Sequence, residues 1–217
     1  MGSIELLRHC VRISEVLAFI IGLFYFDRKD SLHWRYFPFY VGTVAAIELF
    51  GWYLATQKLY LYNNNLYRFI GFPVQFIFLF WLLSRIMAIK NNYKAFIIST
   101  SVYVLCWIAE YYFIPQEGHI TMSISFSVAN LILLILVFLY FHQLINSKQL
   151  LTFYRQRSFW VSLGILLYYL GGFPYYGLFN ALLKNYDFFL VYTHIILALG
   201  SLMYLCFSIS FIWGKEK

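Results

Sequence analysis

Residues 120–144 read ITMSISFSVANLILLILVFLYFHQL, a run that contains no Asp, Glu, Lys or Arg. A membrane-spanning helix needs about 20 mainly apolar residues, so this run predicts a helix that crosses a bilayer. Further runs of similar length lie on both sides of it, and the full set covers approximately residues 6–26, 36–56, 66–86, 94–113, 120–144, 158–180 and 188–212. We therefore predict an all-α polytopic membrane protein, a bundle of seven transmembrane helices.

The composition excludes a soluble domain. Of the 217 residues, 62% are hydrophobic and 12% are charged, whereas a soluble domain is roughly 45–50% apolar and about 25% charged. The net charge of +7 comes from short groups of Lys and Arg beside the apolar runs, rather than from one basic face. We therefore expect anionic lipid headgroups as the counter-charge, and no nucleic-acid partner.

The connections between the predicted helices are short. They cover residues 27–34, 57–65, 115–119 and 146–157, and none is long enough to separate a second domain. We expect residues 1–217 to form a single seven-helix membrane domain. The first helix is the least regular, because a full-length span must include Arg8, Arg12 and Glu15, and an amphipathic or partly interfacial helix remains the alternative.

The distribution of basic residues predicts the orientation. One side of the predicted bundle carries Arg28, Lys29, Arg35, Arg85, Lys90, Lys94, Lys148, Arg155, Arg157, Lys215 and Lys217, and the other carries Arg8, Arg12, Lys58, Arg68 and Lys184. Loops rich in Lys and Arg stay in the cytoplasm. We therefore place the N-terminus outside and the C-terminus in the cytoplasm.

Strongly polar side chains are few within the predicted helices. A charge at the centre of a membrane helix costs about 2.5–3.5 kcal/mol on insertion scales, so such residues commonly face a partner or a cavity. All of them fall in the middle or outer half of the bilayer. The candidate residues for ligand binding or proton relay are Glu15, Glu48, Gln75, Glu110, Asn130 and His194.

Glu48 is the strongest of these candidates. No basic residue lies within one helical turn of it, so its carboxyl is expected to be protonated or to find a partner on another helix. The others have structural alternatives that stay open. Glu15 can pair with Arg12, Asn130 can bond a neighbouring helix, His194 can be a structural histidine, and Glu110 can be a solvated boundary residue.

Two predicted helices contain prolines. Gly71-Phe72-Pro73 lies in the third, and Gly171-Gly172-Phe173-Pro174 lies in the sixth. Proline removes a backbone hydrogen bond and displaces the preceding turn, so Pro73 and Pro174, with Gly171 and Gly172, predict kinks. Both kinks fall in the outer half, where they would open a cavity near Gln75. The alternative is that prolines are simply common in membrane helices.

Known membrane chemistries leave no signature in the chain. The seventh predicted helix has no lysine for a retinal Schiff base, and only His194 lies well inside a span. No GxSxG, HExxH or phosphate-loop motif occurs. We predict no catalytic residue, metal or cofactor. Cys10, Cys106 and Cys206 lack metal-ligand spacing and are interpreted as small buried apolar residues.

The sequence thus favours a small seven-helix sensor or receptor, which would bind a small or lipophilic ligand in an outer cavity and signal to a separate cytoplasmic partner. The architecture resembles that of seven-helix bacterial sensor modules, although no motif identifies a family. The alternative is a proton-coupled transporter that uses Glu48, and the third class is a lipid-modifying enzyme. We expect membrane lipids as partners, leave a homo-oligomer open, and expect a bacterial inner membrane.

Overall fold

The computed structural model describes residues 2–27, 30–87, 92–113, 123–177, 182 and 186–214, and every regular element in these ranges is helical. The elements are α1 (Ser3–Phe24), α2 (Leu32–Thr56), α3 (Tyr60–Leu66), the π-helical turn η1 (Tyr67–Gly71), α4 (Phe72–Ile86), α5 (Asn92–Phe113), α6 (Ser123–Ile145), the 3₁₀ helix η2 (Lys148–Arg155), α7 (Arg157–Gly177) and α9 (Tyr186–Trp213).

The second connection is shorter than the sequence predicts. Residues 57–65 were expected to form it, but α3 begins at Tyr60 and runs through η1 into α4 as one rod. A tight turn is sufficient because Lys58 adopts a positive φ of 59°. The three asparagines at 63–65 favour loops in general, yet here the N–H of Asn63 already donates to the carbonyl of Leu59 at 3.0 Å and continues the helix.

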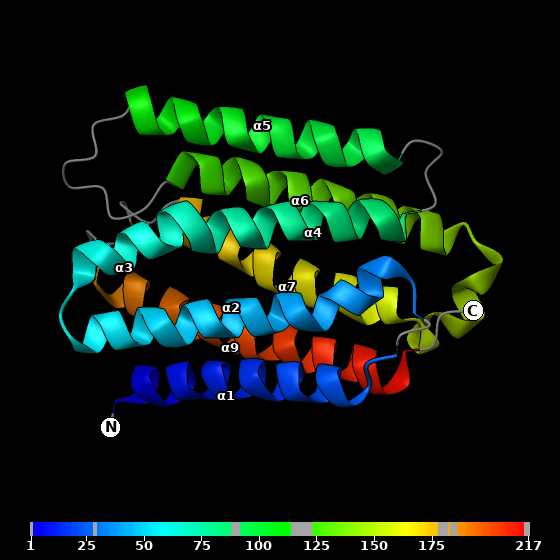
Figure 1. Ribbon diagram of the computed structural model, residues 1–217, viewed down its shortest axis with the longest axis horizontal. Coiled ribbons are helices and arrows are strands. Elements are labelled where there is room, and N and C mark those ends of the chain that lie inside the picture. Colours follow the sequence, from blue (N-terminus) through cyan, green and yellow to red (C-terminus); the bar gives the residue numbers. More distant parts are fainter. Residues whose placement is uncertain are drawn as a thin grey trace.

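Successive long helices run in opposite directions (Figure 1). The bundle therefore has two ends. The N-terminal end carries Ser3 and the turn at 57–59, and the C-terminal end carries η2 and Gly214. Arg35, Arg85, Arg155 and Arg157 lie toward the C-terminal end, so the basic residues separate between the ends as the sequence predicts.

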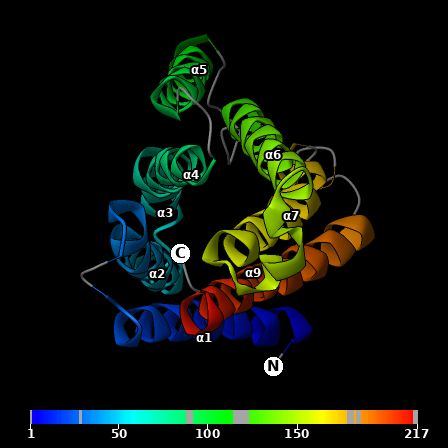
Figure 2. The same ribbon diagram turned by 90° about the vertical axis from the view of Figure 1, so that its right-hand side faces the viewer.

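Of the seven long helical rods in the described ranges, six form a closed ring. Around it, α1 packs on α2, α2 on α4, α4 on α6, α6 on α7, α7 on α9, and α9 returns to α1. The remaining helix, α5, packs on α4 and α6 and lies outside the ring (Figure 2). This arrangement leaves the middle of the ring to side chains from six helices.

Five of these rods are long and apolar enough to cross a membrane: α2, the rod of α3, η1 and α4, then α5, α6 and α9. The composition and these helices identify a membrane protein. The described parts of α1 and α7 fall short of this measure for different reasons. The helix α1 carries Glu5, Arg8, Arg12 and Glu15, whereas α7 is diluted by Ser, Gly, Tyr and Pro.

Aromatic rings fill the part of the ring nearer the C-terminal end. Tyr40 stacks on Phe78 with their centroids 4.1 Å apart, and Phe37 contacts both Phe207 and Phe211 within 5.2 Å. Aromatic pairs in such offset and edge-to-face arrangements add about 0.5–1.5 kcal/mol beyond the area they bury. We call Phe37, Tyr40, Phe78, Phe207 and Phe211 the aromatic floor. It lies on the C-terminal side of the interior.

Cysteine burial differs from the prediction at one position. All three cysteines are free, but Cys10 is exposed, whereas Cys106 is half-buried and Cys206 is buried. Cys10 lies on a different face of α1 from the buried Glu15 and Ala18. The helix turns Glu15 inward, so the small apolar Cys10 is left on the outer surface.

Arg157 joins the connection before α2 to the end of α9 at the C-terminal end of the bundle. Its guanidinium pairs with Asp30, and its Nε donates to the carbonyl of Gly214 at 2.9 Å. We expect Arg157→Ala to lower the free energy of unfolding by about 2 kcal/mol, because a partly buried carboxylate and a carbonyl lose a charged donor. Denaturation of the purified protein in mixed micelles would measure this. Arg155→Ala, which removes an exposed neighbour, should change little, and equal effects of the two variants would contradict the prediction.

Candidate functional site

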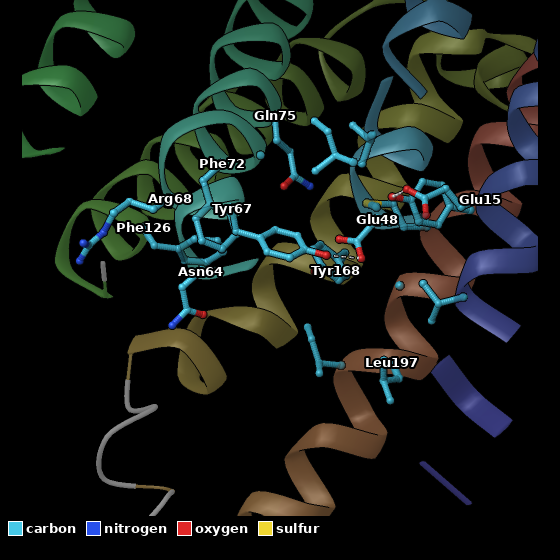
Figure 3. Close-up of a pocket in the computed structure, with 18 residues that line it drawn as sticks. Glu15, Glu48, Asn64, Tyr67, Arg68, Phe72, Gln75, Phe126, Tyr168 and Leu197 are labelled. Carbon is cyan, nitrogen blue, oxygen red and sulfur yellow. Dashed lines mark hydrogen bonds between the residues drawn. The ribbon is translucent and has the colours of Figure 1, made fainter. Parts of the chain in front are cut away.

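A cavity of about 320 Å³ lies inside the ring of six helices. Known small-molecule sites span about 300–1,000 Å³, so this volume suits a small ligand. Every ring helix contributes to the wall, and α5 contributes none of the lining residues (Figure 3). The lining residues are Val11, Glu15, Val44, Ile47, Glu48, Asn64, Tyr67, Arg68, Gly71, Phe72, Gln75, Phe126, Tyr168, Ile196, Leu197, Gly200, Met203 and Tyr204.

Three of the predicted polar residues meet at this cavity. Glu15 comes from α1, Glu48 from α2 and Gln75 from α4, so residues from three helices converge on one space. Figure 3 shows Glu48 and Tyr67 meeting within the cavity, with Glu15 farther along the same wall. The cavity is otherwise bounded mainly by aliphatic and aromatic side chains.

The position of Tyr67 follows from the proline that the sequence marks. Pro73 cannot donate a backbone hydrogen bond, and the five residues before α4, Tyr67–Gly71, form a π-helical turn. Single π turns insert an extra residue into a helix and occur frequently at functional sites. Here the turn directs Tyr67 toward Glu48, and its hydroxyl donates to Glu48 Oε2 at 2.8 Å.

Glycine at position 51 leaves the space that the Tyr67 hydroxyl occupies. A Cβ atom at Gly51 would lie 2.6 Å from the Tyr67 hydroxyl oxygen and 3.0 Å from Asn63 Oδ1. Both distances are shorter than van der Waals contact allows. The small residue on α2 therefore permits the hydrogen bond between Tyr67 and Glu48.

Glu15 is oriented in the same manner by a second tyrosine. Its side chain is 1% exposed, and Oε1 accepts a 2.6 Å hydrogen bond from the hydroxyl of Tyr204 on α9. The ion pair with Arg12 that the sequence left open does not form. Arg12 instead places its guanidinium 5.0 Å from the centre of the Trp52 ring, a cation–π contact at the edge of the bundle.

Each of the two carboxyls keeps one oxygen without a hydrogen-bond partner among the described residues. Tyr204 occupies Glu15 Oε1 and Tyr67 occupies Glu48 Oε2, so Glu15 Oε2 and Glu48 Oε1 bond to no other described residue. The amide of Gln75 likewise forms no hydrogen bond within the described part of the chain, although it lines the cavity. The site thus holds acceptor oxygens in fixed positions with their bonding capacity unused.

The other three candidates lie elsewhere. Glu110 accepts hydrogen bonds from the backbone N–H groups of Ile124 and Ser125, at 3.0 and 2.7 Å, and so caps the start of α6. His194 bonds through Nε2 to the hydroxyl of Ser3 and through Nδ1 to the carbonyl of Leu190. These contacts are structural, since they stabilise the start of one helix and join α9 to α1.

Asn130 on α6 is fully buried and lies outside the cavity. Neither its amide nitrogen nor its amide oxygen has a hydrogen-bond partner among the described residues. The bond to a neighbouring helix that the sequence left open is therefore not formed with any residue that the structure describes.

The glycines and proline of α7 do not contribute to the cavity wall. The helix continues through Pro174 to Gly177. A Cβ atom at Gly171 would lie 2.1 Å from the side chain of Leu199, so Gly171 allows α9 to approach closely. Gly172 is buried in the same helix. Tyr168 is the one described residue of α7 that lines the cavity. Of the two proline-containing segments, the one before Pro73 forms part of the cavity wall, and the one around Pro174 does not.

Sequence reasoning missed the two tyrosines that orient the carboxyls. Tyr67 and Tyr204 are indistinguishable by type in a chain with 20 tyrosines. The helical period could have indicated Tyr67. Asn64, Tyr67, Gly71 and Gln75 recur at spacings of three and four residues and so share one helix face. Glu48 then needed a donor from an adjacent helix.

No group of three or more His, Cys, Asp or Glu side chains that could hold a metal ion occurs in the ranges that the structure describes. Comparisons with protein-family models, with curated proteins and with solved structures find no match. Any functional conclusion therefore depends on the chemistry of the site itself.

Proposed function

We propose that this chain is a seven-helix membrane sensor that binds a small ligand in the cavity and signals to a separate cytoplasmic partner. The observation that carries the proposal is a cavity of about 320 Å³ lined by residues from six helices. Its wall includes one oxygen each of Glu15 and Glu48 that accepts no hydrogen bond from a described residue. Pockets of this kind, mostly apolar with a few convergent polar groups, are the usual sites of small ligands.

Occupancy of such a cavity can be transmitted because the ring is closed. A ligand shifts a conformational equilibrium only by the difference in its affinity for the two states. The affinity of a molecule that contacts all six ring helices depends on the relative positions of those helices. One of the six rods is interrupted by the π-helical turn η1. The aromatic floor lies directly between the cavity and the C-terminal end, so helix shifts would pass through it.

We further propose that all seven rods cross the membrane, in a bacterial inner membrane, with the N-terminal end outside. Exposed apolar side chains on α1 support its crossing. Ile13, Leu17, Ile20 and Phe24 are 59%, 50%, 40% and 82% exposed, while Glu15 is turned into the bundle. An apolar outer stripe around a buried polar face is the pattern expected of a helix that contacts lipid.

This orientation predicts the outcome of cysteine labelling. In a chain whose three native cysteines are replaced by serine, Lys58→Cys should react with a membrane-impermeant maleimide in intact cells, because the turn at 57–59 lies at the N-terminal end. Tyr154→Cys in η2 should react only after the membrane is opened. The reverse pattern would invert the orientation, and labelling of both in intact cells would rule out three crossings between residues 58 and 154.

A proton-coupled carrier is the second candidate, and one observation favours it. Two carboxyls, Glu15 and Glu48, share the cavity, and carboxyls within membrane bundles are used to load and release protons. Against it, packed aromatic rings of the aromatic floor lie toward the C-terminal end. Proteoliposomes separate the two functions, since a carrier would accumulate a ligand inside the vesicle, whereas a sensor would only bind it.

Ligand binding can be tested by filling the cavity. A Cβ atom at Gly200 meets nothing closer than 3.6 Å, so a larger side chain can enter the cavity from there. We expect Gly200→Leu to abolish the thermal stabilisation that any compound from a panel of small cations, anions and neutral molecules confers on the purified protein in lipid nanodiscs. Ala198→Leu adds similar bulk on the exposed face of the same helix and should retain it. A panel without any stabilising compound, or equal binding to both variants, would contradict the proposed site.

A further inference from the structure

The unused oxygens of the two glutamates define the kind of ligand. We propose that the cavity binds a small organic cation that carries N–H donors, such as a primary ammonium or a guanidinium group on a compact apolar body. This inference rests on the proposed ligand-binding role of the cavity and adds the chemical class of the ligand.

The first argument is the geometry of the acceptors. Each glutamate has one oxygen held by a tyrosine hydroxyl, at 2.6 Å for Glu15 and 2.8 Å for Glu48. The hydroxyl fixes the carboxyl while the second oxygen stays available toward the cavity. A bound cation would hold the carboxyls in their ionised form, in which they are acceptors only, and charge-assisted hydrogen bonds are roughly twice as strong as neutral ones.

The second argument is that the nearby protein cations are directed elsewhere. Arg12 lies over the Trp52 ring and is not part of the cavity wall, so it interacts with Glu15 and Glu48 through its charge but forms no ion pair with either. Arg68 lies at the edge of the cavity, and Figure 3 shows its guanidinium directed away from Glu48. The described residues therefore supply tyrosine hydroxyls but no ammonium or guanidinium group within ion-pair distance of either carboxyl.

The third argument is the wall. Phe72, Phe126 and Tyr168 present aromatic rings to the same space, and cations are attracted to ring faces within about 6 Å. The carbonyl oxygen of the Gln75 amide adds a neutral acceptor. An anionic ligand would face two acidic groups, and a purely apolar ligand would leave three polar groups without partners.

Binding to the full chain in lipid nanodiscs tests the class directly. The probes are 2-phenylethylamine, its neutral analogue 2-phenylethanol, the anion 3-phenylpropanoate and the quaternary cation benzyltrimethylammonium, all of similar size. Calorimetry should show the primary amine binding at least about tenfold more tightly than the alcohol, the anion or the quaternary cation, which corresponds to the loss of one charge-assisted hydrogen bond.

Variants locate the binding. We expect Glu15→Gln and Glu48→Gln each to weaken binding of the amine about tenfold or more, because each loses a charged acceptor without losing volume. Glu5→Gln removes the same charge from the exposed start of α1 and should leave affinity unchanged. The comparison of the four probes uses the unaltered chain. The proposal can therefore be refuted even if a glutamate variant fails to fold.

The outcomes separate this inference from the proposed function. If the alcohol or the anion binds as tightly as the amine and Gly200→Leu blocks it, the cavity binds ligands but the cation class is wrong. If the quaternary cation equals the amine, the role of N–H donors is wrong. If none of the four probes binds, the inference fails, while the wider panel still decides whether the cavity binds anything.

Discussion

Glu110→Ala is expected to be among the most destabilising single substitutions in the chain. The Glu110 side chain is 6% exposed, and its two carboxyl oxygens accept separate hydrogen bonds from the N–H groups of Ile124 and Ser125. The first N–H groups of a helix have no partner within the helix, and an unsatisfied buried donor costs about 1–3 kcal/mol. We expect the free energy of unfolding to fall by about 3 kcal/mol.

Titration with a denaturing detergent in mixed micelles would measure this loss. Glu110→Gln keeps one carbonyl acceptor and should lose about half as much as the alanine variant. Glu5→Ala, which removes an exposed glutamate from α1, should stay within about 0.5 kcal/mol of the unaltered chain, as surface substitutions generally do. A Glu110→Ala variant as stable as Glu5→Ala would show that the cap does not contribute.

The hydrogen bonds of Glu110 distinguish it from the glutamates that line the cavity. The helix α5 lies outside the ring and gives no residue to the cavity wall, yet its Glu110 is buried like Glu15 and more deeply than the half-buried Glu48. The difference lies in hydrogen bonding. Both oxygens of Glu110 are occupied by backbone donors, whereas Glu15 and Glu48 each keep one oxygen that no described residue occupies.

The helices themselves were predictable because the bilayer length imposes a long apolar run on each. The expected range 94–113 matches α5 at Asn92–Phe113, and 188–212 matches α9 at Tyr186–Trp213. Hydropathy averages over a helix and reports where it crosses, but it does not report which face points inward. The number of crossings therefore rests on five helices, since the charges of α1 and the small residues of α7 weaken the signal there.

The site was predictable in part for the same reason. The free-energy cost of exposing a polar side chain to lipid predicts that Glu15, Glu48 and Gln75 face the interior. The structure places all three on one cavity. Cost applies equally to Glu110, Asn130 and His194, which avoid lipid by being buried or bonded elsewhere. Which polar residues converge depends on the rotation of each helix about its axis, and that rotation is set by contacts between distant segments, such as Tyr204 with Glu15.

Gly164→Leu is expected to separate the two most closely packed helices, α7 and α9. A Cβ atom at Gly164 would lie 3.1 Å from the backbone carbonyl oxygen of Met203 and 3.0 Å from Cys206 Cβ. Small residues at such crossings let membrane helices approach until their backbones touch. Because the obstacle is backbone rather than a flexible side-chain end, added bulk must push the helices apart.

We expect Gly164→Leu to lower the free energy of unfolding by about 3 kcal/mol, at the upper end of the cost of overpacking, and Gly164→Ala by about 1 kcal/mol. Gly200→Ala is the matched control, because its Cβ would meet only ordinary contacts at 3.6 Å and beyond. That variant should be neutral or slightly stabilising, since alanine favours a helix more than glycine does. Equal losses at both positions would mean that helix propensity, not close packing, is the reason for glycine at 164.

The same substitution should reach the cavity. Tyr168 lies one helical turn beyond Gly164, and Met203 and Tyr204 lie opposite it on α9, so all three wall residues depend on this crossing. A shift of α9 would lengthen the 2.6 Å hydrogen bond that fixes Glu15. Gly164→Ala should therefore weaken binding of the primary amine even where the protein stays folded, and unchanged affinity would show that the Tyr204 contact tolerates movement of the helix.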